Sequence, residues 1–236
     1  MEHAIYTVSV TYAWTGSTAG WREEQERLRK LARIEPLREL PRYVAGADCA
    51  FSRSPRSPRD AGVPTLIRAA AVVYDREAKA IVGHAAIERP CEVPYVPTFL
   101  SFREAPAILE VIGKLKHPFG AILFDGQGIA HPRRCGLATH VGVLLNVPTV
   151  GVAKSRLIGT HADVPAVAGA RVPLFDRGET IGVVYRGKAT SRPLYVSVGH
   201  RTDLESAIAL VAACQTKYRL PEPTRVADQL SKFRKS

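Results

Sequence analysis

Short apolar runs alternate with longer amphipathic stretches along most of this chain. The short runs are rich in Val, Ile, Ala and aromatic residues and are bounded by Gly, Pro, Asp or Asn, which is typical of buried β-strands. They lie at Tyr43–Phe51, Leu66–Tyr74, Ala80–Ile87, Ala121–Phe124, Thr149–Ala153, Thr180–Tyr185 and Leu194–Val198. The longer stretches have helical spacing and lie at Trp21–Ala32, Phe99–Leu115, Gly136–Leu145 and Asp203–Cys214. Ser17 or Thr18 is expected to start the first of these helices.

The order of these elements predicts the fold class. The first three strands should form an antiparallel meander, after which helices alternate with parallel strands, and the last two strands form a hairpin. This order indicates a three-layer α/β fold in which helices flank a central mixed β-sheet. We expect a single domain over residues 1–236, with residues 1–18 as a poorly ordered extension and Ser52–Val63 as a flexible basic loop. Near the C-terminus, a loop with a proline-rich turn is expected to return Asp228 to the main site.

Charge adds a second indication. Lys and Arg total 33 against 22 Asp and Glu, which gives a formal net charge of +11. An excess of this kind favours a polyanionic partner, although it does not identify a reaction. The four cysteines form no CxxC or Cys/His metal spacing, so we expect buried reduced thiols in a reducing cytoplasm.

No stretch is apolar over enough residues to cross a membrane. The longest candidate, Val141–Ala153, is interrupted by Asn146 and Pro148. The first residues also lack the basic leader of a secretory signal. We therefore expect a soluble, cytoplasmic protein that is monomeric and makes no membrane contact.

Residues 119–134 carry the main indication of chemistry. A short apolar run ends in Asp125 and is followed by Gly126 and Gly128, which is the pattern of a buried strand that delivers one carboxylate to its C-terminal tip. The glycines would let the backbone approach a bound group closely. Donors suited to phosphate follow, namely His131, Arg133 and Arg134. The alternative is that Asp125 only opens a turn.

Two further acids need an explanation. Asp48 lies inside an apolar strand, so its carboxylate must be hydrogen-bonded, paired, protonated or metal-bound, and a bond to neighbouring backbone is the simplest alternative. Glu104 lies near a helix start, where the dipole alone favours a carboxylate. Together with Asp125, these acids suit Mg²⁺ or Mn²⁺. Lys154 would neutralise a bound phosphate, or it is an ordinary strand-end lysine.

Prolines on both sides of an aromatic residue predict a rigid, exposed loop before Glu104. Pro94 and Pro97 flank Tyr95 in this loop. An aromatic ring held in this way suits a wedge that stacks on, or replaces, a base extruded from nucleic acid. The alternative is that Tyr95 packs on its own domain.

Five segments resemble motifs of the endonuclease V family of deaminated-base repair nucleases. They are YVAGADCAF, PYVPTFLSFRE, LFDGQGIAHPRRCGLATHVG, PTVGVAKS and RLPEPTRVAD, within about residues 20–230. The resemblance implies a ribonuclease H-like fold and metal-dependent hydrolysis of the second phosphodiester bond 3′ to deoxyinosine. The products would carry 3′-hydroxyl and 5′-phosphate ends, and the base would not be excised.

The resemblance also implies roles for individual residues. Asp48, Glu104 and Asp125 match the metal ligands, with Mg²⁺ as the ion and Mn²⁺ as a substitute, and Lys154 matches the catalytic lysine. Asp228 matches a position near a second metal. The residues matched to substrate binding are Tyr95, Pro94 and Pro97 in the wedge, and Gly126, Gln127, Gly128 and His131 in the base and phosphate pocket.

One position departs from the family pattern, and it leaves the range of lesions open. Relatives often have glycine after the second proline of the wedge, where this chain has Thr98, whose side chain could narrow the pocket. The partner implied is double- or single-stranded DNA that contains deaminated bases. Two alternatives stay open: an endoribonuclease specific for inosine-containing RNA, and a lesion-binding module without catalysis.

Overall fold

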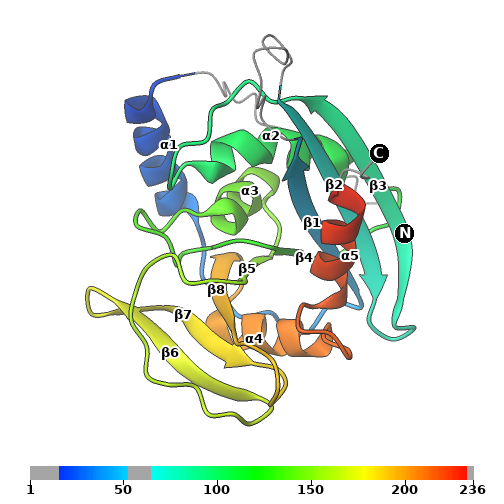
Figure 1. Ribbon diagram of the computed structural model, residues 1–236, viewed down its shortest axis with the longest axis vertical. Helices are drawn as coiled ribbons and strands as arrows, with labels where there is room; N and C mark the ends of the chain where they lie inside the picture. The colour runs from blue at the N-terminus through cyan, green and yellow to red at the C-terminus, as the bar shows by residue number, and fades with distance from the viewer. Residues whose placement is uncertain (1–15, 53–64, 233–236) are drawn as a thin grey trace.

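One mixed β-sheet crosses the whole molecule in the computed structural model of this protein (Figure 1). The structure describes residues 16–52 and 65–232, so most of the predicted N-terminal extension and basic loop lies outside the described residues. In sheet order the strands are β3 (Ala80–Pro90), β2 (Leu66–Asp75), β1 (Tyr43–Phe51), β4 (Ala121–Phe124), β5 (Thr149–Ala153), β8 (Leu194–His200), β7 (Glu179–Arg186) and β6 (Ala170–Asp176).

The strand directions confirm the predicted order. β1, β2 and β3 form an antiparallel meander, and β1, β4 and β5 run parallel to one another. β7 and β8 form the predicted antiparallel hairpin. Parallel neighbours require crossover connections, and helices between β3 and β5 provide them.

Helices cover both faces of the sheet, which confirms the three-layer α/β architecture. On one face lie α2 (Leu100–Gly113) and α3 (Leu137–Leu145), with α1 (Thr18–Leu31) outside them. On the other face lie α4 (Leu204–Ala213) and α5 (Glu222–Ser231). Ser17 caps α1 as predicted, because its hydroxyl accepts a hydrogen bond from the backbone N–H of Gly20.

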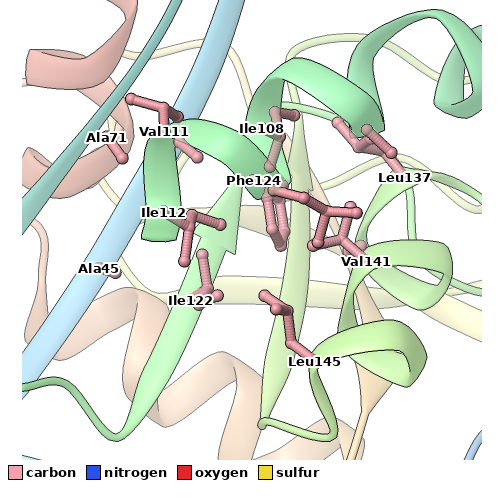
Figure 2. Close-up of a cluster of buried hydrophobic side chains, with 14 of the residues drawn as sticks. Ala45, Ala71, Ile108, Val111, Ile112, Ile122, Phe124, Leu137, Val141 and Leu145 are labelled. Atoms are coloured by element: carbon pink, nitrogen blue, oxygen red, sulfur yellow. The ribbon is translucent and has the colours of Figure 1, made fainter. Parts of the chain in front are cut away.

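The alternation of side chains along the central strands decides which residues meet each helical layer. Figure 2 shows Ile122 and Phe124 of β4 packed with Ile108 and Ile112 of α2 and with Val141 of α3. The residues between them on the central strands point to the opposite face and pack with α4. Each large apolar side chain buried in these layers contributes about 1.5–3 kcal/mol to the free energy of unfolding.

Two elements were not predicted, and proline explains both. β6 contains Pro173, which is tolerated because β6 is an edge strand. The expected loop with a proline-rich turn before Asp228 was wrong, since Asp228 lies on helix α5. Pro221 precedes this helix and Pro223 lies in its first turn, where no intrahelical N–H bond is lost.

The expectation of buried thiols holds for Cys135 and Cys214, whereas Cys49 and Cys91 are only partly buried. All four cysteines are free thiols. Across residues 16–52 and 65–232, none of the helices has the length and apolar character needed to span a bilayer.

Candidate active site

The parallel register brings three predicted residues to the same edge of the sheet. Ala47 of β1 pairs with Phe124 of β4, so the residues that follow them, Asp48 and Asp125, are neighbours. Both side chains point toward the face that α5 covers, because they alternate with residues that pack under α2 and α3. Lys154 follows β5 at this edge, and its ammonium group forms an ion pair with Asp125.

Helix α5 adds two more side chains to this edge. Ser231 Oγ donates a hydrogen bond to Asp48 Oδ2 at 2.8 Å. Lys154 Nζ donates to Asp228 Oδ1 at 3.0 Å, and Lys232 also pairs with Asp228. The lysine therefore lies between a carboxylate that follows β4 and a carboxylate on α5.

Glu104 reaches the same site from the opposite helical layer. It lies in the second turn of α2 and is buried. Burial, together with the charges of Asp48 and Asp125, raises the pKa of Glu104 to about 8. The charges of the two aspartates at the carboxyl ends of the parallel strands therefore act on Glu104 from across the sheet edge.

The other carboxylates of the site feel the same burial but have closer partners. Burial raises the pKa of Asp48 to about 6, although the hydrogen bond from Ser231 opposes this rise. Burial also raises the pKa of Asp125, despite the hydrogen bond from Lys154. Burial would raise the pKa of Asp228 as well, but hydrogen bonds from Lys232 and Lys154 together have the larger effect and hold this pKa below its usual range. The site thus concentrates more negative charge than its own cations neutralise.

This set of oxygen donors fits a hard divalent cation. Within the ranges 16–52 and 65–232, no three acidic, His or Cys side chains enclose a metal position as they stand. The ammonium group of Lys154 lies between Asp125 and Asp228 in this arrangement. Carboxylate oxygens are nevertheless the ligands that Mg²⁺ and Mn²⁺ prefer, and a bound cation would offset both the burial and the repulsion that raise the pKa of Glu104.

The loop between β3 and α2 presents Tyr95 to the solvent. Val93 and Val96 of this loop pack on a cluster formed by Trp21, Phe99 and Phe102. Tyr95 lies between the two valines and is 66% exposed, and both predicted prolines, Pro94 and Pro97, are exposed as well. The loop is therefore held at its apolar positions and leaves the aromatic ring free for a ligand.

A cavity of about 360 Å³ lies between this loop and the acidic site. Among the residues that line it are Tyr95, Thr98, Asp125, Gly126, Gln127, His131 and Lys154. Gln127 Nε2 donates to the backbone carbonyl of Ser155 at 3.0 Å, which orients the amide. The opposite atom, Gln127 Oε1, is buried and accepts no hydrogen bond from the described residues.

Gly128 does not line this cavity, contrary to the sequence-based assignment. Its backbone lies against β8, where a Cβ atom would overlap the carbonyl oxygen of Val198. Its N–H donates to Ser197 Oγ at 2.8 Å. This glycine therefore permits two backbones to approach each other and does not contact the cavity.

Two of the predicted phosphate donors are already used by the protein. Burial lowers the pKa of His131 to about 4, so the imidazole is neutral at pH 7. Its Nε2 donates to the Thr98 carbonyl at 2.9 Å, and its Nδ1 accepts from the N–H of Arg133. Arg134 forms ion pairs with Asp176 and Glu179. His131 and Arg134 therefore hold loops in place. His131 also lines the cavity, and its contact with the substrate stays a prediction.

Sequence reasoning missed Gln25, a side chain of α1 that holds the end of the wedge loop at Thr98. Thr98 has φ 68°, a left-handed conformation that is unusual for a β-branched residue. Its carbonyl accepts hydrogen bonds from Gln25 Nε2 at 3.1 Å and Arg133 Nη2 at 2.8 Å, as well as from His131. Gln25 lies on the helix face of Trp21 and Leu28, and this spacing was the available signal that it is buried.

Comparison with known proteins found matches in both sequence and structure. The family model for endonuclease V matches residues 26–229. Endonuclease V of Rippkaea orientalis is 45% identical over 224 residues, which cover 95% of this chain and 94% of the relative. The crystal structure of endonuclease V from Streptomyces avermitilis has a TM-score of 0.85 at 37% identity and covers 95% of this chain and 96% of that chain.

A solved complex in the comparison contains nucleic acid. Endonuclease V of Ciona intestinalis, bound to a 24mer DNA containing an inosine followed by a ribo-adenosine, has a TM-score of 0.73 at 28% identity. It covers 90% of this chain and 95% of that chain. These structures confirm the ribonuclease H-like α/β fold that the sequence motifs implied. The chain belongs to the endonuclease V family.

Proposed function

We propose that this chain is a metal-dependent DNA repair endonuclease. It nicks the second phosphodiester bond 3′ to deoxyinosine and other deaminated bases, and it leaves 3′-hydroxyl and 5′-phosphate ends. The observation that carries this proposal is the meeting of Asp48, Glu104, Asp125 and Lys154 at one sheet edge, beside a cavity bordered by Tyr95.

The acids and the lysine have different tasks in this proposal. Asp48, Glu104 and Asp125 hold Mg²⁺, for which Mn²⁺ can substitute, and Asp228 is the candidate ligand of a second ion. The bound ion supplies Lewis acidity toward the phosphodiester and activates water. Burial alone would lower the pKa of Lys154, but hydrogen bonds to Asp125 and Asp228 and the charges of these two acids outweigh it and raise the pKa above its usual value. The lysine therefore stays charged and neutralises the phosphate.

Gln127 supports recognition of a deaminated base. Deamination of adenine converts the ring nitrogen N1 from an acceptor into an N–H donor. The unpartnered Oε1 of Gln127 in the cavity wall would accept from such a donor, whereas adenine would leave two acceptors facing each other. The exposed Tyr95 is suited to fill the space that the extruded base leaves.

The direct test is cleavage of an end-labelled duplex that carries one deoxyinosine. The reaction is run with Mg²⁺, Mn²⁺ or EDTA, and the product ends are mapped beside an unmodified duplex. We expect a nick one nucleotide beyond the lesion with either ion and none with EDTA. Binding without a nick under all three conditions would instead identify a lesion-binding module.

A matched RNA that contains inosine belongs in the same experiment. The DNA in the Ciona intestinalis complex carries a ribo-adenosine after the inosine, so a neighbouring ribonucleotide is compatible with binding in that relative. Faster cleavage of the RNA than of the DNA would favour the endoribonuclease alternative, since the site would then use the 2′-hydroxyl.

Divalent cations should stabilise this fold before any nucleic acid is added. At Mg²⁺ concentrations about 100 times the dissociation constant, we expect the free energy of unfolding to rise by about 2.7 kcal/mol, which corresponds to about 5–10 °C in Tm. Thermal unfolding followed by circular dichroism measures this shift. A monovalent salt at equal ionic strength is the control for screening.

The variant Glu104→Gln separates ion binding from general stability. It replaces a carboxyl whose ionisation is disfavoured by burial and by the charges of Asp48 and Asp125, so the metal-free variant should be at least as stable as the parent chain. Its increase in Tm with Mg²⁺ should be much smaller than that of the parent. An equal increase in both proteins would exclude Glu104 from the metal site.

Tyr95→Ala should weaken binding to deoxyinosine DNA without changing stability. The ring is exposed, so its loss removes little packing, whereas a stacked base contact is worth about 1–3 kcal/mol, or roughly 5–150-fold in Kd. Fluorescence anisotropy with lesion and unmodified duplexes measures the ratio of the two affinities. Ile34→Ala is the control, because Ile34 is 63% exposed but lies outside the cavity. An unchanged ratio in Tyr95→Ala would contradict the wedge assignment.

A further inference from the structure

A second, strongly basic hollow opens next to the active-site cavity. It has a volume of about 630 Å³ and is bounded by the C-terminal part of α1, the loop after β4, and the turn between β6 and β7. The residues that line it are Glu26, Arg29, Lys30, Pro132, Arg133 and Arg177. We call it the basic groove. The elements that form it lie along one side of the molecule (Figure 1).

The four cations that line the basic groove outnumber its one carboxylate, Glu26. Within residues 16–52 and 65–232, neither Arg29 nor Lys30 forms an ion pair. Arg177 Nε is 3.8 Å from Asp176 Oδ2, but that carboxylate is already bonded to Arg134 at 2.8 Å. The helix dipole would explain cations in the last turn of α1, but it does not explain cations from two other elements at the same place.

The groove continues directly from the active-site cavity. Arg133 lines the groove, and its Nη2 donates to both the carbonyl and the hydroxyl of Thr98, which lines the cavity. His131, which lies two residues earlier, lines the cavity as well. A strand that leaves the cavity past Thr98 and His131 would therefore meet the basic groove next.

We propose that the basic groove binds the phosphodiester backbone of the substrate strand where it leaves the active-site cavity. Arg29, Lys30 and Arg177 contact the phosphates, because they are exposed and come from two sides of the groove. Arg133 contributes charge, while its Nε and Nη2 hold Gln25 and Thr98. This inference rests on the proposed function and adds the path of the nucleic acid outside the lesion site.

The salt dependence of binding tests this path. Each phosphate contact contributes about 0.7 to the slope of log K against log salt for single strands, and about 0.9 for duplexes. The triple variant Arg29→Gln, Lys30→Gln, Arg177→Gln should therefore lower the slope for a deoxyinosine single strand by about 2. Between 50 and 200 mM salt, its loss of affinity should be about 20-fold smaller than that of the parent.

A second triple variant is the matched control. Lys79→Gln, Lys114→Gln, Lys116→Gln removes the same charge from exposed positions at the opposite ends of the parallel strands. We expect this control to keep the slope of the parent. Equal changes in both triple variants would show a general effect of net charge and would overturn the proposal.

The length of the oligonucleotide locates the contact, and cleavage separates this inference from the function. Shortening one flank to two nucleotides should abolish the difference between the groove variant and the parent. A difference that survives shortening of both flanks would overturn the proposal. The groove variant should retain the parental single-turnover rate at saturating enzyme. Failure of the parent to cleave would count against the proposed function, whereas the salt slopes would still test the groove.

Discussion

Asp125→Asn is expected to lower the rate of cleavage at deoxyinosine by about 10³-fold or more, equivalent to about 4 kcal/mol of transition-state stabilisation. Asp125 is related to each of the other residues predicted to be catalytic. It neighbours Asp48 in the parallel register, pairs with Lys154, and acts on the pKa of Glu104. Asparagine keeps the shape but removes the charge that an ion and the lysine both require.

Binding should survive this substitution, and that result separates chemistry from recognition. Removal of a negative charge near the phosphate does not weaken attraction for a polyanion, so salt-sensitive binding should be retained. Single-turnover cleavage and anisotropy are measured on the same preparation. Asp163→Asn, at an exposed position outside the cavity, is the control and should behave as the parent. Parental turnover in Asp125→Asn would exclude this carboxylate from the metal site.

The sequence predicted the acidic edge because strand periodicity is local. A short apolar run that ends in an acid defines both the strand and the tip to which Asp125 is delivered. Side-chain alternation then determines which face Asp48 shares with it. Glu104 could be placed near a helix start, but its burial among like charges depends on how α2 packs across the sheet. That packing is a property of the tertiary structure and has no local signal.

The positions that sequence reasoning misplaced depend on contacts between distant segments. Gly128 follows the predicted tip, yet its neighbour is β8, some seventy residues away, and this contact removes it from the cavity. Gln25 was given no role from the sequence, but its Nε2 donates hydrogen bonds to the backbone carbonyls of Thr98 and Cys135. Arg134 was predicted to donate to phosphate, but its guanidinium group forms ion pairs with Asp176 and Glu179.

The position of α5 follows from one glycine on β1. Gly46 lies two residues before Asp48, on the same face of the sheet. A Cβ atom at Gly46 would overlap the carbonyl carbon and oxygen of Pro223 and would lie 2.7 Å from its Cβ. The first turn of α5 therefore rests directly on the backbone of β1. This close approach allows Ser231 and Asp228, further along the helix, to reach Asp48 and Lys154.

Gly46→Ala should accordingly damage both stability and catalysis. The added methyl group meets helix backbone, which cannot turn aside as a side chain can, so we expect a loss of about 3 kcal/mol in the free energy of unfolding. This corresponds to about 6–12 °C in Tm. Because α5 must shift to make room, Asp228 and Ser231 lose their partners, and the cleavage rate of the folded fraction should fall at least about tenfold.

Gly113→Ala is the matched control for this substitution. Gly113 is the last residue of α2, and a Cβ atom there would meet nothing within 4 Å. Replacement of an unhindered helical glycine by alanine should raise stability by roughly 0.5–1 kcal/mol and leave cleavage unchanged. Thermal unfolding and single-turnover cleavage of the two variants, side by side, therefore compare one methyl group at two sites. If Gly46→Ala melts and cleaves like Gly113→Ala, the contact between β1 and α5 does not position Asp228.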